Sequence, residues 1–344
     1  MKESLIHQRI ESIWRTESAK VVASLTRMVR DISIAEDLAQ DTLIIALERW
    51  PVSGIPDNPG AWLVTVAKRK AIDMLRRKKR LDQKYEQMAY EMNTHFEPDL
   101  ADDIDEDIKD NLLRLIFMTC HPVLSKNARV ALTLRLVGGL TTEEIANAFL
   151  VPEPTIAQRI VRAKRTLAAA NVPFEVPQRR AYAERLSSVL EVIYLMFNEG
   201  YSASSGDNLI RMNLCNEALR MGRVLADLIL TEPEVYGLVA LMEIQVSRFK
   251  ARTNSEGEMI LLQDQNRSLW NQEHIGRGVA SLKKAEDLGG TLGMYALQAS
   301  IAACHAIADT LEKTNWERIS ILYDALSEIA PSPVVELNRA VAIS

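Results

Sequence analysis

The amino-acid sequence predicts an all-α protein of two or three domains. The 344 residues are 47% hydrophobic and 25% charged, which is typical of a folded, soluble chain. The 14 glycines and 12 prolines cluster at a few points, and between them the apolar residues recur at helical spacing. No run of alternating β-branched residues lies between turn signals, so we expect no strands.

The cysteines and the longest uncharged stretch exclude several classes of protein. Cys120, Cys215 and Cys304 stand far apart without a Cys-x-x-Cys pair, which argues against a disulfide framework or a zinc ribbon. The N-terminus has no apolar signal-peptide core, and residues 288–308 are too polar to span a membrane. We therefore predict a cytoplasmic protein without a membrane partner, a bound metal or a cofactor.

The net charge of −5 conceals an asymmetry along the chain. Residues 1–80 carry 15 basic and 10 acidic side chains, and residues 128–180 carry 8 and 4. The connector 81–127 and the remainder 181–344 each have a net charge of −7. Two basic modules that flank an acidic connector predict a nucleic-acid partner, because such surfaces attract phosphate backbones.

The first basic module contains an amphipathic helix, expected over 33–50. Its inner face carries Ala35, Leu38, Thr42, Ile45 and Ala46. Its outer face is acidic around one apolar residue and consists of Asp37, Gln40, Asp41, Ile44 and Glu48. We expect this outer face to dock a protein partner, with an ordinary solvated face as the alternative.

A proline- and glycine-rich loop, 51–60, leads into one long helix over 58–80 that ends in a basic cluster. One stripe of this helix joins an aromatic residue to cations, namely Trp62, Thr65, Arg69, Asp73, Arg76 and Arg80. Such a stripe can stack on unpaired bases and hold the phosphate backbone. The alternative is a core tryptophan with a solvated basic helix end, and for Trp62 itself the sequence favours the core.

The acidic stretch EPDLADDIDEDIKD, 97–110, follows a polar segment that begins at residue 81. Its composition predicts a flexible linker over 81–110 between the two basic modules.

Residues 140–168 have the pattern of a helix-turn-helix. Thr141 and Glu144 form a capping box at the start of a short helix. A tight turn at 150–152 precedes a second helix, in whose first turn the missing N–H of Pro154 costs nothing. The inner sector of that second helix is apolar and carries Ile156, Ile160, Ala163 and Leu167.

The outer sector of the second helix is polar and basic and would enter the major groove of DNA. Arginine forks read guanine edges or hold phosphates, and a glutamine can pair with adenine. The residues of this face are Thr155, Gln158, Arg159, Val161, Arg162 and Arg165. An amphipathic surface helix with solvated arginines is the alternative.

In this order, the pieces resemble bacterial RNA polymerase sigma factors of the extracytoplasmic-function class of the sigma-70 family. AEDLAQDTLIIALERW resembles region 2.2, which docks on polymerase. GAWLVTVAKRKAIDMLRRKKR resembles regions 2.3 and 2.4, which melt and hold the −10 element. Residues 113–167 resemble region 4, which reads the −35 element. The resemblance implies that Arg69 contacts the −10 strand, that loop 51–59 captures a flipped base, and that Gln158, Arg159, Val161 and Arg162 face the −35 duplex.

The expected organisation is region 2 over 1–80, the linker over 81–110, region 4 over 111–172 and a helical domain over 178–344. That last part resembles the subgroup with a tetratricopeptide-like extension, on the motifs CHP at 120–122, FNEGY at 197–201 and LLQDQNRSLWN at 261–271. Where that subgroup often carries Asp-Gly-Gly-Arg, this chain has Ser255-Glu256-Gly257-Glu258. The final segment, VVELNRAVAIS, begins a helix and then stops, and no polar capping repeat follows it. Because terminal repeats usually need such a cap, we expect the last repeats to be missing.

The acidic extension predicts an intramolecular contact with the basic modules that regulates them in cis. A peptide or small-molecule sensor is a second hypothesis, suggested by the polar clusters 198–201 and 204–207, whose other explanation is a helix end followed by a capped turn.

The sequence thus predicts a transcription initiation factor that binds core RNA polymerase and promoter DNA. It is not expected to be an enzyme, because phosphoryl transfer belongs to polymerase and no catalytic motif is present. The alternative is a one-component helix-turn-helix repressor or activator with a ligand-binding helical domain. That alternative leaves the first module unexplained.

Overall fold

The computed structural model describes residues 2–86, 104–201, 208–254, 259–290 and 292–343. Within these ranges every regular element is a helix, and one isolated bridge joins Thr253 to Met259. The prediction of an all-α fold is confirmed. The packing divides the chain into two compact units, 1–189 and 190–344, which are described separately.

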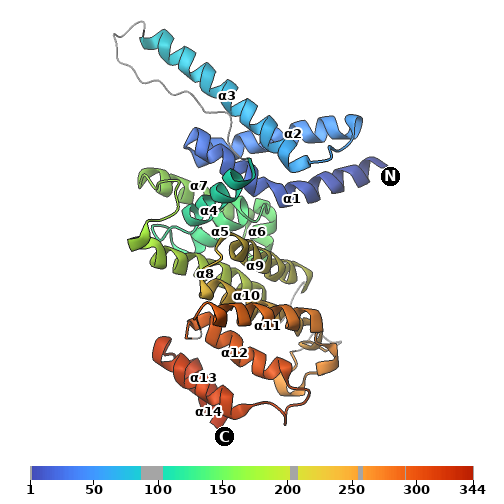
Figure 1. The fold of residues 1–344 in the computed structure, drawn as a ribbon. Coiled ribbons are helices and arrows are strands. Elements are labelled where there is room, and N and C mark those ends of the chain that lie inside the picture. The colour runs from blue at the N-terminus through green and yellow to red at the C-terminus, as the bar shows by residue number, and fades with distance from the viewer. Residues whose placement is uncertain (1, 87–103, 202–207, 255–258, 291, 344) are drawn as a thin grey trace. The chain divides into compact units, whose positions relative to one another are not determined.

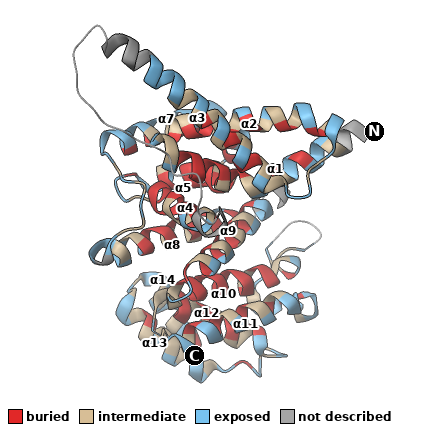
Figure 2. Cartoon of the chain, turned by 45° about the horizontal axis from the view of Figure 1, so that its top comes forward, coloured by how far each residue is buried: buried red, intermediate tan, exposed pale blue. Residues whose placement is uncertain are grey.

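The described residues of unit 1 form seven helices and the first half of an eighth (Figure 1). They are α1 (Lys2–Val29), α2 (Ile32–Ser53), α3 (Pro59–Glu86), α4 (Ile104–Thr119), α5 (Lys126–Leu136), α6 (Thr142–Ala148), α7 (Glu153–Ala169) and α8 (Arg179–Tyr201). α1 packs against α2, α3 and α4, so it belongs to the cores of both basic modules. Figure 2 shows the buried residues of α4 and α5 beside those of α1.

The loop expected over 51–60 is shorter than predicted, because α2 continues through Pro51 to Ser53. Proline is compatible with helical φ and removes only one backbone hydrogen bond in a last turn. The helix ends at Gly54, whose φ of +84° favours glycine and whose N–H donates to Trp50 O at 3.0 Å.

The predicted linker is wrong at both ends. α3 extends to Glu86 and α4 begins at Ile104, so residues 81–86 and 104–110 are helical. Lys and Glu are good helix formers and acidic residues are favourable in the first turn of a helix, so these segments propagate helices that the neighbouring modules have already nucleated. Residues 87–103 of the expected linker lie outside the described residues.

The boundary between the units falls inside α8 and not at residue 178. The first half of α8 closes the core of unit 1, where Ser188 Oγ donates to Cys120 O at 2.6 Å. Arg185 Nη2 donates to Phe117 O at 2.7 Å, and the rings of Phe117 and Tyr182 lie 5.8 Å apart. Sequence composition misplaces this boundary because the prolines before α8 look like the end of a domain.

The helices of unit 2 are the regular elements among its described residues. Its further elements are α9 (Asn208–Leu228), α10 (Pro233–Ser247), the 3₁₀ turns Phe249–Ala251, Leu262–Asp264 and Arg267–Leu269, α11 (Gln272–Asp287), α12 (Met294–Ile307), α13 (Trp316–Ile329) and α14 (Pro333–Ile343). α10 is buried along its length and packs against α9, α11 and α12 (Figure 2). Gly237 allows its close approach to α12, since a Cβ there would lie 2.7 Å from Ala296 N.

The prediction of a helical C-terminal domain is confirmed, and its tetratricopeptide-like character stays a prediction. A smaller core joins α12 to α13 and α14 and contains Leu297, Ile301, Ile319, Leu326 and Ala342. The expected polar turn at 204–207 and the segment 255–258 lie outside the described residues.

Candidate nucleic-acid interface

Local signals position the second helix of the helix-turn-helix, α7. Thr141 Oγ1 accepts from Glu144 N at 3.1 Å while Glu144 Oε2 accepts from Thr141 N at 2.8 Å, so the predicted capping box is confirmed. The turn into α7 passes through Leu150, whose φ is +51°. The four predicted inner residues of α7 are all buried: Ile156, Ile160, Ala163 and Leu167.

The outer face of α7 is open to solvent as the sequence predicted. Of the six residues expected to contact DNA, Arg159 is half-buried and the others are exposed. Four of them, Thr155, Gln158, Arg159 and Arg162, line a hollow of about 360 Å³ together with the start of α5. The hollow brings the arginine forks beside the N-terminus of α5, where backbone N–H groups favour an anion such as a phosphate.

The stripe on α3 is also exposed over most of its length. Thr65, Arg69, Arg76 and Arg80 are exposed, and Trp62 is half-buried. The indole of Trp62 packs edge-on against the buried Trp50, with ring centroids 5.2 Å apart. Trp62 therefore meets the expectation of a core position only in part, because some of its ring surface stays accessible.

The acidic face of α2 lies on the surface as expected. Asp37, Asp41, Ile44 and Glu48 are exposed, and Gln40 is half-buried. Asp41 Oδ2 pairs with Lys70 Nζ of α3 at 2.7 Å. Ile44 is 53% exposed, so an apolar side chain stands in the centre of this charged face. An exposed apolar residue with a charged rim is typical of a protein-docking surface.

One functional residue escaped the sequence analysis. Glu36 of α2 is only 8% exposed and pairs with two cations of the second module, Lys164 of α7 and Arg135 of α5. Arg135 Nε donates to Glu36 Oε1 at 2.6 Å, and Lys164 Nζ donates to Glu36 Oε2. We call these three residues the Glu36 clasp. Both partners of Glu36 lie far along the chain, so the sequence does not reveal the pairing. The one local signal is a charged residue next to Ala35, on the inner face of the predicted helix.

The electrostatics of the Glu36 clasp favour the ionised carboxylate. Burial raises the pKa of Glu36, but the charges and hydrogen bonds of Lys164 and Arg135 outweigh burial and hold the pKa below its ordinary value. The clasp is therefore a charged contact at neutral pH.

Further contacts join the two basic modules around the Glu36 clasp. Arg15 of α1 pairs with Glu144, which belongs to the capping box of α6. Gly139 has a φ of +69°, and a Cβ there would lie 2.8 Å from Ser18 Oγ and 3.3 Å from Arg15 O. Unit 1 therefore holds the two modules against each other.

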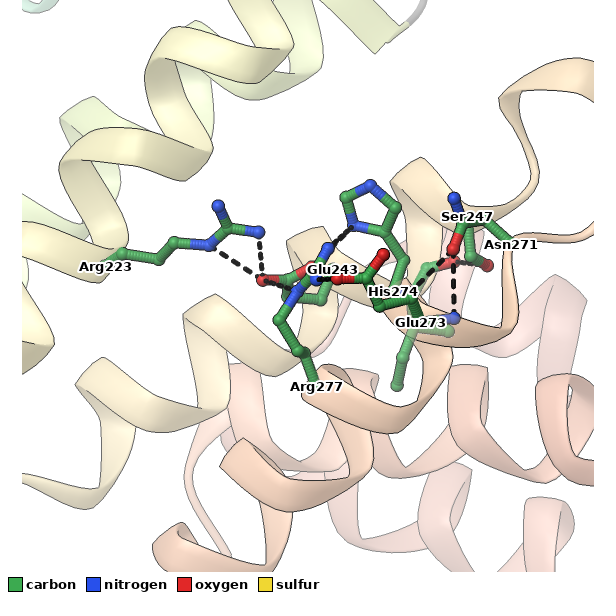
Figure 3. A network of polar contacts seen from close by, with 8 residues as sticks. Arg223, Glu243, Ser247, Asn271, Glu273, His274 and Arg277 are labelled. Carbon is green, nitrogen blue, oxygen red and sulfur yellow. Dashed lines mark hydrogen bonds and ion pairs between the residues drawn. The ribbon is translucent and has the colours of Figure 1, made fainter.

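A charged network lies inside unit 2 (Figure 3). The Glu243 carboxylate is 1% exposed and accepts from Arg223 Nε at 2.8 Å. His274 Nδ1 lies 2.6 Å from Glu243 Oε2, and Arg277 Nε donates to the same oxygen at 3.4 Å. The network links α9, α10 and α11, and its partners compensate the buried negative charge.

Other chemistry receives no support from the described residues. Cys120 is buried at the end of α4, and burial raises the pKa of its thiol to about 11. Across the described ranges no cluster of His, Cys, Asp and Glu is suited to a metal ion. Within the same ranges no helix has the length and apolar character needed to cross a membrane.

Comparison with protein families gives three matches along the chain. Residues 13–81 match sigma-70 region 2, and residues 114–167 match sigma-70 region 4. Residues 185–286 match a family of unknown function, DUF6596. The matches follow the order of the two basic modules and the extension.

Comparison with curated proteins gives relatives of two kinds. An uncharacterized protein of Rhizobium meliloti, R00370, is 43% identical over 327 residues, which cover 94% of this chain and 77% of that protein. A probable ECF RNA polymerase sigma factor of Mycobacterium tuberculosis, SigI, is 27% identical over 49% of this chain and 58% of its own length. The ECF RNA polymerase sigma factor SigK of a Mycobacterium species is 28% identical over 42% of this chain and 74% of its own length.

Proposed function

The chain belongs to the extracytoplasmic-function class of the sigma-70 family, and we propose how its residues perform the function of that class. It is a transcription initiation factor that directs RNA polymerase to promoters. The alternative of a one-component repressor is not favoured, because it requires only the helix-turn-helix and leaves the region 2 match unexplained. The chain acts in the cytoplasm and leaves phosphoryl transfer to polymerase.

In this proposal α7 reads the −35 duplex and α3 holds the opened −10 strand. The exposed outer face of α7 above a fully buried inner face carries the argument. Arg162 and Gln158 are free to reach base edges, while Arg159 and Arg165 grip phosphates. On α3, Trp62 and Thr65 meet an unstacked base, and Arg69, Arg76 and Arg80 follow its backbone.

The acidic face of α2 docks on core polymerase. Ile44 supplies apolar contact area, and the surrounding carboxylates and Gln40 orient the factor on a basic partner surface. Docking requires this face to be accessible in the folded chain. Among the described residues, its one ion pair is that between Asp41 and Lys70.

The Glu36 clasp keeps the free factor in a closed form. The −10 and −35 elements are about 25 base pairs apart, which is about 85 Å of duplex at 3.4 Å per base pair. A compact body of 189 residues has a radius of gyration of about 16 Å, or roughly 40 Å across. Modules in contact cannot reach both elements, so the clasp opens when the factor binds polymerase and promoter.

The C-terminal unit regulates this cycle in cis. Its net charge of −7 complements the charges of +5 and +4 on the basic modules. The intramolecular contact that this implies is a proposal, and its test is the effect of removing the unit.

Co-purification with bacterial core RNA polymerase tests the proposed function. We expect the full chain and a chain ending after residue 201 to be retained. The cut follows α8, because a cut at residue 180 would remove Arg185 and Ser188 from the core of unit 1. Retention of the short form alone would identify unit 2 as autoinhibitory. Retention of neither folded form would refute the proposed function, and equal transcription by both would refute regulation in cis.

A further inference from the structure

A second group of charged side chains in unit 2 contrasts with the Glu243 network. Arg248 follows α10 directly, five residues after Glu243, and lies near Arg252, Arg267 and His305. With two aromatic residues, Tyr201 and Trp270, these side chains form what we call the Arg248 cluster. The Arg267 guanidinium lies 4.8 Å and that of Arg248 6.0 Å from the centroid of the Trp270 ring. The Arg252 guanidinium lies 3.7 Å from the centroid of the Tyr201 ring.

The positive charges of the cluster form no ion pair with a carboxylate among the described residues. Around Glu243, one carboxylate meets three basic side chains, whereas Arg248, Arg252 and Arg267 form no ion pair in the described ranges. Burial lowers the pKa of Arg267 although the Glu312 carboxylate raises it, and the charge of Arg248 lowers it further. Burial and the charge of Arg248 also lower the pKa of Arg252, against an opposite effect of Tyr201. The pKa of His305 falls to about 4 through burial and the charges of Arg248 and Arg267. The three arginines thus have one nearby carboxylate, the exposed Glu312, and it forms no ion pair with them.

Several buried polar atoms of the cluster are also unpaired. Trp270 is 3% exposed, and its indole N–H has no acceptor among the described residues. Within the same part of the chain, Arg248 Nε and Arg267 Nη2 are buried donors without an acceptor, and His305 Nδ1 is without a partner too. Buried donors are normally satisfied, because an unpaired one costs about 1–3 kcal/mol. These two charged donors and one neutral donor belong to side chains grouped at the Trp270 ring, and an oxyanion would satisfy them.

A structural role explains two of the arginines but not the third. Arg252 Nη1 donates to Tyr201 O at the end of α8 at 2.7 Å, and Arg267 Nη1 donates to Ala308 O after α12 at 2.7 Å. Both therefore cap helix C-termini, where cations are favourable. In the part of the chain that the structure describes, Arg248 donates only to the hydroxyl of Tyr201, at 2.9 Å. Its remaining donors are available to a ligand.

We propose that the Arg248 cluster binds a small oxyanion, a phosphate or carboxylate group carried by a metabolite. Arg248 and Arg267 provide the forked donors that match such a group, and Trp270 Nε1 adds a neutral donor. Cation–π contacts with Trp270 position the guanidinium groups of Arg248 and Arg267, so the site is organised before the ligand binds. This inference does not depend on promoter recognition, because every residue belongs to unit 2.

The test is thermal unfolding of the full chain in inorganic phosphate, in citrate and in sodium chloride at equal ionic strength. Phosphate and citrate separate the two sources of the oxyanion. Because excluded anions stabilise most proteins and the basic faces of unit 1 also attract phosphate, the decisive quantity is the difference between the native chain and Arg248→Met. The matched control is Arg339→Met, which removes an exposed arginine whose partners are Asp324 and Glu336.

We expect phosphate or citrate to raise the melting temperature of the native chain and of Arg339→Met by at least about 2 °C more than that of Arg248→Met. Arg248→Lys keeps the charge without the fork, and should bind the same anion about tenfold more weakly by titration calorimetry. If Arg248→Met does not fold, the affinity of Arg248→Lys for the anion tests the proposal in its place. Equal shifts in all variants, or no shift beyond chloride, would show a structural cation cluster only and would overturn the proposal.

Discussion

Replacing Glu36 by glutamine should open unit 1 while leaving each module folded. Glutamine keeps the size of the side chain and removes the charge that holds Arg135 and Lys164. The perturbation is therefore confined to the Glu36 clasp. Its consequence is larger than that of a surface pair, because all three side chains are largely buried.

The magnitude follows from the burial of the partners. Breaking a fully buried pair by removing one partner costs about 3–5 kcal/mol, and an exposed pair is worth about 0–1 kcal/mol. The side chains of Lys164 and Arg135 retain 15% and 22% exposure, so their stems allow the charges to reach water. We expect a loss of about 2–3 kcal/mol from the contact, which shifts the ratio of closed to open forms by roughly 30- to 150-fold.

Hydrogen exchange of α2 and α7 measures this opening, together with transcription at a limiting concentration of the factor. Glu36→Gln should exchange faster at the contact and should raise initiation, because less free energy is needed to separate the modules. The matched control is Glu328→Gln, which removes an exposed carboxylate of α13.

A double-mutant cycle with Lys164→Met isolates the pair. The combined variant should lose less stability than the two single variants together, since each removes the same interaction. Strict additivity, or unchanged exchange in Glu36→Gln, would refute the reasoning that this ion pair closes unit 1.

Three further predictions concern the same unit. Arg162→Ala should lower −35-dependent initiation about 5- to 150-fold, since a bidentate base contact is worth about 1–3 kcal/mol; equal run-off transcription would mean a solvated arginine. Gly139→Ala should destabilise unit 1 by about 1–3 kcal/mol in urea unfolding, because of its φ of +69° and the 2.8 Å approach to Ser18 Oγ; native stability would exclude this tight contact. Because the folded pKa of Glu36 lies below the ordinary value of 4.5, the clasp contributes stability above that value and loses it as pH falls through the folded pKa. The unfolding free energy of Glu36→Gln should therefore fall less on acidification than that of the native chain, and parallel curves would contradict this sign.

The helix-turn-helix illustrates what local sequence can predict. Thr141, Glu144 and Pro154 act on backbone groups within one turn of themselves, so their effect can be predicted without knowledge of any tertiary contact. The burial of Ile156 and its neighbours follows from helical periodicity alone. The same reasoning failed for the linker, because a charged segment that extends an existing helix has the same composition as a disordered one.

The sequence by itself determined the all-α class, the order of the modules, the capping box and the outer faces of α2, α3 and α7. These depend on interactions between residues three or four positions apart. The tertiary structure alone decided that Glu36 meets Lys164, that α8 completes the core of unit 1, and that Arg248 forms no ion pair with a described carboxylate. Such features depend on the packing of helices far apart in sequence, where the burial of a charge and the identity of its partner are set by three-dimensional proximity and not by any local pattern.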